Sequence, residues 1–300
     1  MIIRDVMPAF ELYQPTQLRD AFALLDRFGK DGWKMAGGYD SLSWFKERIK
    51  RPKAVIDHTG IEELKGIRET PNGLEIGALT TLTEIERNPV IRAKYRVLAD
   101  AAVKVASPQI RNHGTLVGNL CAAEPWSDPP CLLAALDARL IIVANRGKHK
   151  VSVADWIRGV EQTLRQPDEV LLRIDLPLPR GCRGIGHTRL AARQGLARPL
   201  ACAAAHVEVS ENGNVATARV FVGAVGPRPQ RMGEVETMLV GASLGEELFR
   251  EVQHAVTRSI EYLPDERCGE SYKRDVAGVL ARRAIAEAVD DARTRRRQCR

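Results

Sequence analysis

The stretch KMAGGYDSLSWFKERIK, residues 34–50, places two adjacent glycines between a short apolar run and a helix-like segment. Residues 33–36 (WKMA) predict a strand, and SLSWFKERI behind the glycines predicts a helix. A Gly-Gly turn between them can be an ordinary loop. It can also be a nest of backbone N–H groups that receives an anion, most often a phosphate. The rest of the sequence is needed to choose between these interpretations.

Segments on both sides continue this order of strands and helices. FELYQP and KAVIDHT predict strands, and TQLRDAFALLDRFGK between them predicts an amphipathic helix with i, i+3, i+4 spacing. A hairpin is expected to turn at residues 71–73, a helix to span 95–107 up to the Ser-Pro pair, and another helix to lie near 129–137. Beyond a proline and glycine cluster at about 177–184, two strands around residues 211–213 and helices at 234–240, 246–262 and 271–295 predict an α+β unit.

Length and composition favour a globular protein of two domains. The chain has 300 residues, of which 44% are hydrophobic and 28% charged. No apolar run approaches the roughly 18–20 residues of a membrane span, and the first residues lack the order of a secretory signal. We therefore expect a cytoplasmic protein. The net charge of +7 owes much to arginines at 292–300, and with 5% aromatic residues we expect no nucleic-acid site.

Cysteine and histidine spacing gives no sign of a metal centre. The six cysteines, at positions 121, 131, 182, 202, 268 and 299, form no C-x-x-C pair, and the histidines form no H-x-x-x-H or H-x-H pair. We therefore predict that the chain holds no metal, and that Cys121 and Cys131 are buried free thiols.

Several catalytic motifs are also missing. The sequence has no G-x-x-x-x-G-K-[ST], no G-x-G-x-x-G after a strand and no G-x-S-x-G. Glu124 and Asp128 share a loop, but two carboxylates four residues apart are expected to be solvated. These patterns do not favour an enzyme whose side chains carry the chemistry.

Two glycine loops remain, AGGYDS at 36–41 and GTLVGNL at 114–120. Two such loops can hold a pyrophosphate between them without lysine or magnesium, because backbone N–H groups and neutral donors share its charge. Ser41, Thr115 and Asn119 are the side chains that we expect to serve as these neutral donors.

Longer strings make the hypothesis specific. MAGGYDSL, ASPQIRNHGTLVGNL, SDPPCLLAALDA and EVLLRIDLP resemble the FAD-binding subunit of the molybdenum hydroxylases, which include the medium subunits of bacterial xanthine and carbon monoxide dehydrogenases. VGAVGPRPQR and SYKRDVAGVLARRAI resemble the second domain of these subunits. The most specific string is QIRNHGTLVGNL.

The resemblance implies an α+β fold of the vanillyl-alcohol-oxidase/PCMH type. Two subdomains, at about 1–57 and 58–178, would enclose FAD, and a small C-terminal α+β domain with an antiparallel sheet would occupy 184–296. Some relatives carry a cysteine-rich insertion for a 4Fe-4S cluster directly after GNL. This chain continues from Cys121 to AAEPWSDPP, so we expect no such cluster.

The resemblance also assigns cofactor-binding residues and no catalytic side chain. Residues 35–41 would wrap the FAD pyrophosphate from one side, and the second glycine loop from the other. Asp128 would accept hydrogen bonds from cofactor hydroxyls, Leu171 would pack on adenine or flavin, and Arg189 stands where many relatives carry lysine. The complete predicted set is Lys34, Met35, Ala36, Gly37, Gly38, Tyr39, Asp40, Ser41, Thr115, Gly118, Asn119, Asp128, Leu171 and Arg189.

The function implied is electron transfer within a complex. A large subunit with a molybdopterin-type molybdenum cofactor and a small subunit with 2Fe-2S clusters would be the partners, in a dimer of heterotrimers. The flavin would accept electrons one at a time and pass them to NAD, a quinone or another acceptor. Two alternatives stay open, a stand-alone flavin oxidoreductase and a non-catalytic scaffold that has lost FAD.

Overall fold

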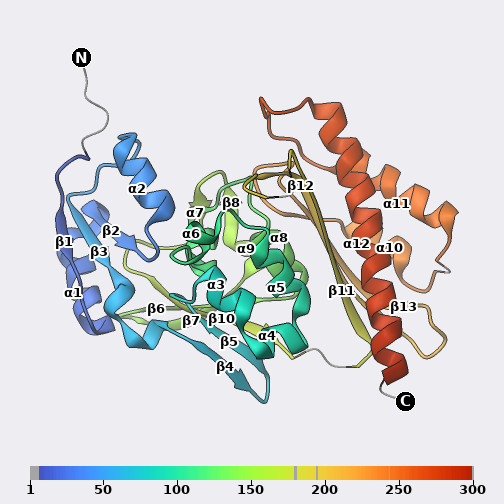
Figure 1. The fold of residues 1–300 in the computed structure, drawn as a ribbon, viewed down its shortest axis with the longest axis horizontal. Helices are drawn as coiled ribbons and strands as arrows, with labels where there is room; N and C mark the ends of the chain where they lie inside the picture. The colour runs from blue at the N-terminus through green and yellow to red at the C-terminus, as the bar shows by residue number, and fades with distance from the viewer. Residues whose placement is uncertain (1–6, 179–180, 194, 243, 299–300) are drawn as a thin grey trace.

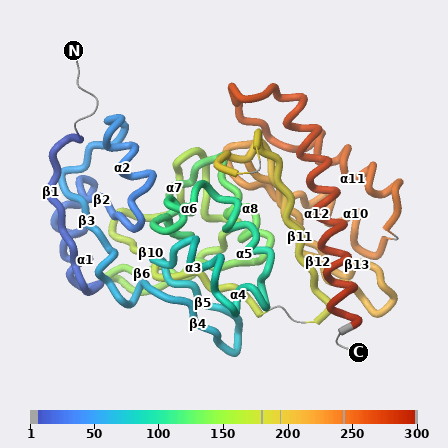
Figure 2. The backbone as a smooth tube through the Cα atoms, in the orientation of Figure 1, coloured from blue at the N-terminus to red at the C-terminus, as the bar shows by residue number. Residues whose placement is uncertain are grey.

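A computed structural model describes residues 7–178, 181–193, 195–242 and 244–298, and shows three units along the chain (Figures 1 and 2). Strands in this part of the chain form sheets of three, five, four and two strands. Cys299 and residues 179–180 of the predicted boundary lie outside the described residues. None of the described helices combines the length and apolar character needed to cross a membrane.

The N-terminal unit is a small parallel sheet with one helix in each crossover. Its strands are β1 (Glu11–Tyr13), β3 (Ala54–Asp57) and β2 (Gly32–Met35), in that order. Helix α1 (Leu18–Phe28) connects β1 to the 3₁₀ turn η1 (Gly29–Asp31) and β2, and α2 (Tyr39–Lys46) connects β2 to β3. Since β2 ends directly before the Gly-Gly turn, the sheet delivers this loop to its carboxyl edge, where ligands of parallel sheets commonly bind.

The middle unit is a five-stranded antiparallel sheet in the order β4-β5-β10-β6-β7. The strands are β4 (Ile67–Thr70), β5 (Gly73–Gly77), β10 (Val170–Pro177), β6 (Arg139–Ala144) and β7 (Gly147–Ser152). The hairpin predicted to turn at residues 71–73 is present as β4-β5, and β6-β7 forms a second hairpin. The 3₁₀ turns η2 (His58–Gly60) and η3 (Glu62–Leu64) lead into this sheet.

Short helices between β5 and β6 lie in the middle of the molecule (Figure 1). They are α3 (Leu82–Arg87), α4 (Pro89–Lys94), α5 (Arg96–Val103), α6 (Pro108–Arg111), α7 (Leu116–Ala122) and α8 (Pro129–Ala135), and α9 (Val153–Trp156) with the β8–β9 hairpin (Ile157–Gly159, Gln162–Thr163) follows β7. The single helix predicted for 95–107 is wrong at its end. It stops at Val103, and Ser107 instead caps α6 by accepting a hydrogen bond from the Ile110 amide at 3.2 Å.

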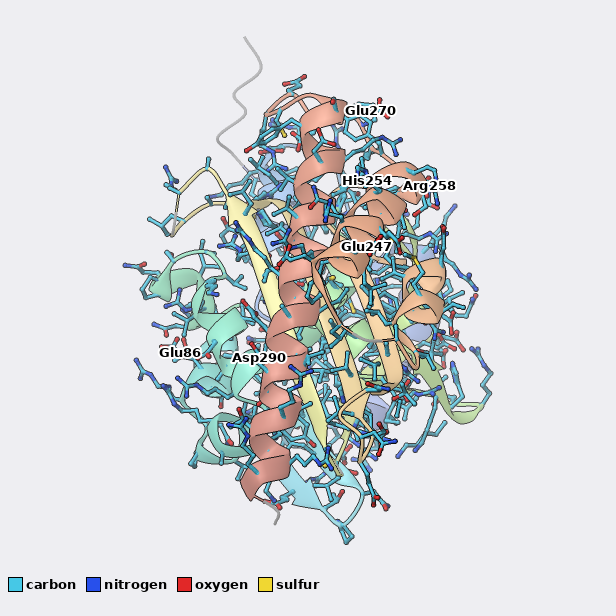
Figure 3. The ribbon with its side chains drawn as sticks, turned by 90° about the vertical axis from the view of Figure 1, so that its right-hand side faces the viewer. Glu86, Glu247, His254, Arg258, Glu270 and Asp290 are labelled. Atoms are coloured by element: carbon cyan, nitrogen blue, oxygen red, sulfur yellow. The ribbon has the colours of Figure 1, made fainter. Side chains whose placement is uncertain are left out.

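The C-terminal unit is an antiparallel sheet with helices on one face. Its strands are β11 (Arg183–Ala191), β12 (Pro199–Val209), β13 (Val215–Gly223) and β14 (Gln230–Arg231), and its helices are α10 (Gly233–Leu239), α11 (Glu246–Ser259) and α12 (Glu270–Gln298). Figure 3 shows α12 lying lengthwise against the strands, with Glu270 near one end and Asp290 toward the other. The proline and glycine cluster at about 177–184 overlaps the nine-residue strand β11, which already begins at Arg183.

Both faces of this sheet are buried, so it joins the units. Successive residues of β12 alternate, with Ala201 and Ala203 in the core under the C-terminal helices and Cys202 and Ala204 in the core of the first two units. Helix α8 packs against β12 and β13 on the latter side. The residues at the start of α8 therefore lie at the junction between the C-terminal sheet and the rest of the protein.

Candidate cofactor site

A cavity of about 550 Å³ lies among the loops that follow β2, precede α7 and α8, and flank β10 and β12. Of the predicted site residues, thirteen line it: Lys34, Met35, Ala36, Gly37, Gly38, Tyr39, Asp40, Ser41, Thr115, Gly118, Asn119, Asp128 and Leu171. The two glycine loops, about 75 residues apart in sequence, thus line the same cavity. Arg189 is not among the lining residues.

Each of the two glycines in the first loop is required by the local backbone, for a different reason. Gly38 has φ +75° and is the N-cap of α2, a backbone conformation that favours glycine. A Cβ on Gly37 would stand 1.9 Å from the His113 carbonyl oxygen and 3.1 Å from the Gly114 Cα. The bare backbone at Gly37 therefore allows the first loop to touch the second.

Helix α2 presents its N-terminus to the cavity. The Leu42 amide donates to the Gly38 carbonyl at 2.9 Å, so the amides of residues 39–41 stand before the first intrahelical bond. All three of these residues line the cavity. Free N–H groups and the positive end of the helix dipole suit an anionic group at this position.

The three predicted neutral donors share one arrangement. The Thr115 hydroxyl oxygen accepts from the Gly118 amide at 2.9 Å, Ser41 Oγ accepts from Trp33 Nε1 at 2.9 Å, and Asn119 Oδ1 accepts from Ser127 Oγ at 2.7 Å. In each case the oxygen already accepts a hydrogen bond from another group of the protein. Among the described residues nothing accepts from the Thr115 and Ser41 hydroxyls or the Asn119 amide, so these groups can donate to a ligand.

Lys34 and His58 bring titratable groups to the cavity wall. Burial, with the nearby Arg165, lowers the pKa of Lys34 to about 7, and its Nζ also contacts the Gln166 carbonyl at 3.4 Å. Burial lowers the pKa of His58 to about 4, with the Lys34 charge adding to the shift. At neutral pH the imidazole is therefore neutral, whereas the Lys34 amine titrates near neutral pH. The sequence pattern did not single out His58.

Asp128 lines the cavity, and Arg189, which does not, holds its carboxylate from behind. Asp128 is 3% exposed, and Arg189 Nε lies 3.1 Å from each oxygen of its carboxylate. The same guanidinium donates to the Ala197 carbonyl at 2.8 Å. Burial raises the pKa of Asp128, and the Arg189 charge opposes this. The expectation that Asp128 would be solvated is wrong, because this loop is covered by the C-terminal sheet.

Trp126, unexplained by the sequence patterns, connects the cavity to the C-terminal unit. Lys273 Nζ lies 4.0 Å and the Arg267 guanidinium carbon 4.8 Å from its ring centroid. Lys273 is fully buried and pairs with Asp265 at 2.5 Å. Since Trp126 also lines the cavity, these cation–π contacts fix one wall to the start of α12. The available signal was a single aromatic residue in a polar, proline-containing loop.

Comparison with known proteins agrees with this geometry. Residues 8–179 match the family model described as the FAD binding domain in molybdopterin dehydrogenase. The chain belongs to this family. Residues 187–288 match the CO dehydrogenase flavoprotein C-terminal domain. The predicted family, fold class and FAD-binding oxidoreductase subunit are thereby confirmed.

Individual relatives match over nearly their whole length. The carbon monoxide dehydrogenase medium chain of Hydrogenophaga pseudoflava is 30% identical over 94% of this chain and 98% of its own. The nicotinate dehydrogenase FAD-subunit of Eubacterium barkeri is also 30% identical, over 95% and 97%. A solved carbon monoxide dehydrogenase from Hydrogenophaga pseudoflava, which lacks the Mo-pyranopterin moiety of its molybdenum cofactor, superposes with a TM-score of 0.91 at 30% identity over 95% of this chain and 99% of that one. Quinoline 2-oxidoreductase from Pseudomonas putida 86 gives 0.89 at 27% identity over 96% and 99%.

Proposed function

We propose that FAD lies in the cavity with its pyrophosphate between the two glycine loops. The observation that carries this proposal is the set of donors at Ser41, Thr115 and Asn119, whose oxygens are already occupied by the protein. With the amides at the start of α2, they offer dispersed hydrogen-bond donors to an anion. The cavity volume falls within the range of roughly 300–1,000 Å³ that is usual for cofactor and ligand sites.

The remaining residues would orient the cofactor along the cavity. Asp128 would accept hydrogen bonds from cofactor hydroxyls, since a carboxylate paired with Arg189 still has lone pairs to offer. Leu171 would pack on an aromatic ring, and Trp126 would close the wall toward α12. Arg189 would act through Asp128 by holding its carboxylate in place.

We further propose that the chain relays electrons within a molybdenum hydroxylase complex. Bound FAD supplies one- and two-electron chemistry, and this chain's residues bind it, orient it and limit its access to water. The 2Fe-2S clusters of a small subunit would be the electron source, and a large subunit would carry the molybdenum cofactor. The matched relatives named as medium chains and FAD-subunits support an assembly of several subunits, for which we propose a dimer of heterotrimers.

The test is isolation of the tagged chain from its natural host at native expression, followed by analysis of flavin, molybdenum and iron. The account predicts FAD in the chain, with molybdenum and iron in two co-isolated subunits. Reduction of the complex through those subunits should bleach the flavin absorbance. A chain that is isolated alone with FAD and reduces an acceptor by itself would instead support a stand-alone oxidoreductase. A colourless chain within the same complex would support a scaffold.

A further inference from the structure

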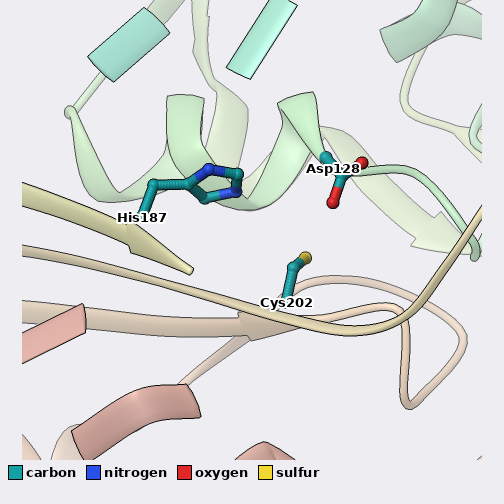
Figure 4. A group of neighbouring side chains, drawn as sticks. All are labelled: Asp128, His187 and Cys202. Atoms are coloured by element: carbon teal, nitrogen blue, oxygen red, sulfur yellow. The ribbon is translucent and has the colours of Figure 1, made fainter. Parts of the chain in front are cut away.

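Three side chains that can bind metal meet behind the cavity wall, at the junction between α8 and the C-terminal sheet (Figure 4). Asp128 comes from the N-cap of α8, His187 from β11 and Cys202 from β12. One ligand atom from each lies within 4.8 Å of the others, and all three residues are buried. Because each comes from a separate segment, their spacing in the sequence gives no motif.

His187 supplies an independent sign that something is bound here. The side chain is 7% exposed, and its Nε2 has no hydrogen-bond partner among the described residues. Figure 4 shows its ring directed toward Asp128 and Cys202. A buried ring nitrogen without a partner is uncommon in folded proteins and calls for a ligand or a structural reason. A neutral imidazole has one ring nitrogen with a free lone pair, and such a nitrogen can coordinate a metal.

Cys131 of α8 stands beside this group. A Cβ on Gly223 would lie 3.0 Å from Cys202 Sγ and 3.5 Å from Cys131 Sγ, so both sulfur atoms surround the space that Gly223 leaves open. Cys202 and Gly223 are register partners on β12 and β13. Cys131 is nevertheless not one of the three residues whose ligand atoms all lie within 4.8 Å of one another, and its thiol donates to the Phe221 carbonyl at 3.4 Å.

We propose that Asp128, His187 and Cys202 form a binding site for one thiophilic divalent cation, Zn²⁺ being the best fit. Three ligands of the N, S and O types suit Zn²⁺ and leave the fourth position of its tetrahedron to another ligand. Because Asp128 also belongs to the proposed FAD site, metal and FAD are measured separately in the test below. The proposal departs from the expectation, drawn from cysteine and histidine spacing, that the chain holds no metal.

The Cys202 thiol would lose its proton when the metal binds, so that its thiolate and the Asp128 carboxylate face the cation. Asp128 also lines the cavity, so a cation can reach the site from that side.

The experiment uses the full chain, treated with a chelator and then loaded with Zn²⁺ or Co²⁺. After dialysis against a weak chelator, bound metal is measured by elemental analysis and FAD by absorbance. Cys202→Ser and His187→Phe each remove one ligand while nearly preserving volume. Cys182→Ser is the matched control, since Cys182 is a free cysteine outside the cluster.

We expect one Zn²⁺ per chain in the wild type and in Cys182→Ser, with at least tenfold weaker retention in Cys202→Ser and His187→Phe at unchanged FAD content. The Co²⁺-loaded wild type should show sulfur-to-cobalt charge-transfer absorbance, which reports thiolate ligation without any variant. An absence of retained metal and of this absorbance would overturn the proposal, as would equal retention in all four proteins.

Discussion

Gly37 beside the cavity and Gly186 on β11 meet nearly the same steric limit. A Cβ would stand 1.9 Å from the His113 carbonyl oxygen at the first position and 2.0 Å from the Ala284 carbonyl oxygen at the second. The first contact joins two loops that line the cavity, and the second joins the C-terminal sheet to α12 in the core. A required glycine therefore marks a close backbone contact, and only its surroundings tell whether a ligand is also involved.

The largest effect on stability is expected for Gly186→Ala. The added Cβ would also lie 2.9 Å from the Ala288 amide nitrogen, so α12 must shift along the packed sheet. Overpacking of this kind should lower the free energy of unfolding by about 3 kcal/mol. Urea unfolding measures this change, and the FAD content of the folded fraction should stay unchanged. A loss below about 0.5 kcal/mol would show that this helix–sheet contact is not rigid.

Gly37→Ala should lower the free energy of unfolding less than Gly186→Ala does, but it should weaken FAD binding more. The loops can separate more easily than a helix and a sheet, so we expect a loss of about 2 kcal/mol. Their separation would displace the pyrophosphate donors, and FAD affinity should fall at least tenfold, the equivalent of about 1.4 kcal/mol.

Flavin fluorescence quenching measures this affinity. Gly233→Ala is the matched control, because a Cβ there would meet no atom within 4 Å. Equal FAD affinity in Gly37→Ala and Gly233→Ala would mean that the contact between the loops does not shape the site.

Trp126→Leu tests a side-chain contact, whereas the two glycine variants test backbone contacts. Loss of the cation–π contacts with Lys273 and Arg267 should lower the free energy of unfolding by about 1 kcal/mol. Thermal or urea unfolding provides the measurement, with Trp44→Leu as a comparison at another wall position. If the Trp126 variant is as stable as the wild type, the wall is not fixed by these contacts.

The smallest effect on FAD affinity is expected from the charge of Lys34. Because burial lowers the pKa of Lys34 to about 7, its side chain is charged below that pH and neutral above it. Attraction to the phosphates should therefore fade as pH rises from 6 to 9. A contribution of about 0.5 kcal/mol corresponds to a two- to threefold loss of FAD affinity. Titrations at both pH values should show this loss in the wild type and a flat response in Lys34→Met; a wild-type affinity that rises with pH would contradict the assignment.

Local patterns predicted much of the fold, and the resemblance supplied thirteen of the residues that line the cavity. The glycine loops, the hairpin that turns at residues 71–73 and the C-terminal helices follow from spacing and turn chemistry. Strand β11 was missed because its glycines resemble a linker. Gly184 and Gly186 are required by the backbone of α12, which packs there about 100 residues later in the sequence.

The sequence patterns could not predict contacts between segments that lie far apart in the chain. Asp128 is buried only because Arg189 and the C-terminal sheet meet it, 61 residues along the chain. Trp126 gains its role from cations near the start of α12. The proposed metal site likewise combines side chains of α8, β11 and β12, which no spacing rule connects.

FAD binding by the purified chain is the decisive measurement for the cavity between the two glycine loops. Visible absorbance gives the stoichiometry, and chromatography of the material released on denaturation identifies the cofactor. We expect one FAD per chain, with markedly less in Gly37→Ala and an unchanged amount in Gly233→Ala. A chain that retains no flavin and does not take up added FAD would contradict the assignment of the cavity between the two glycine loops.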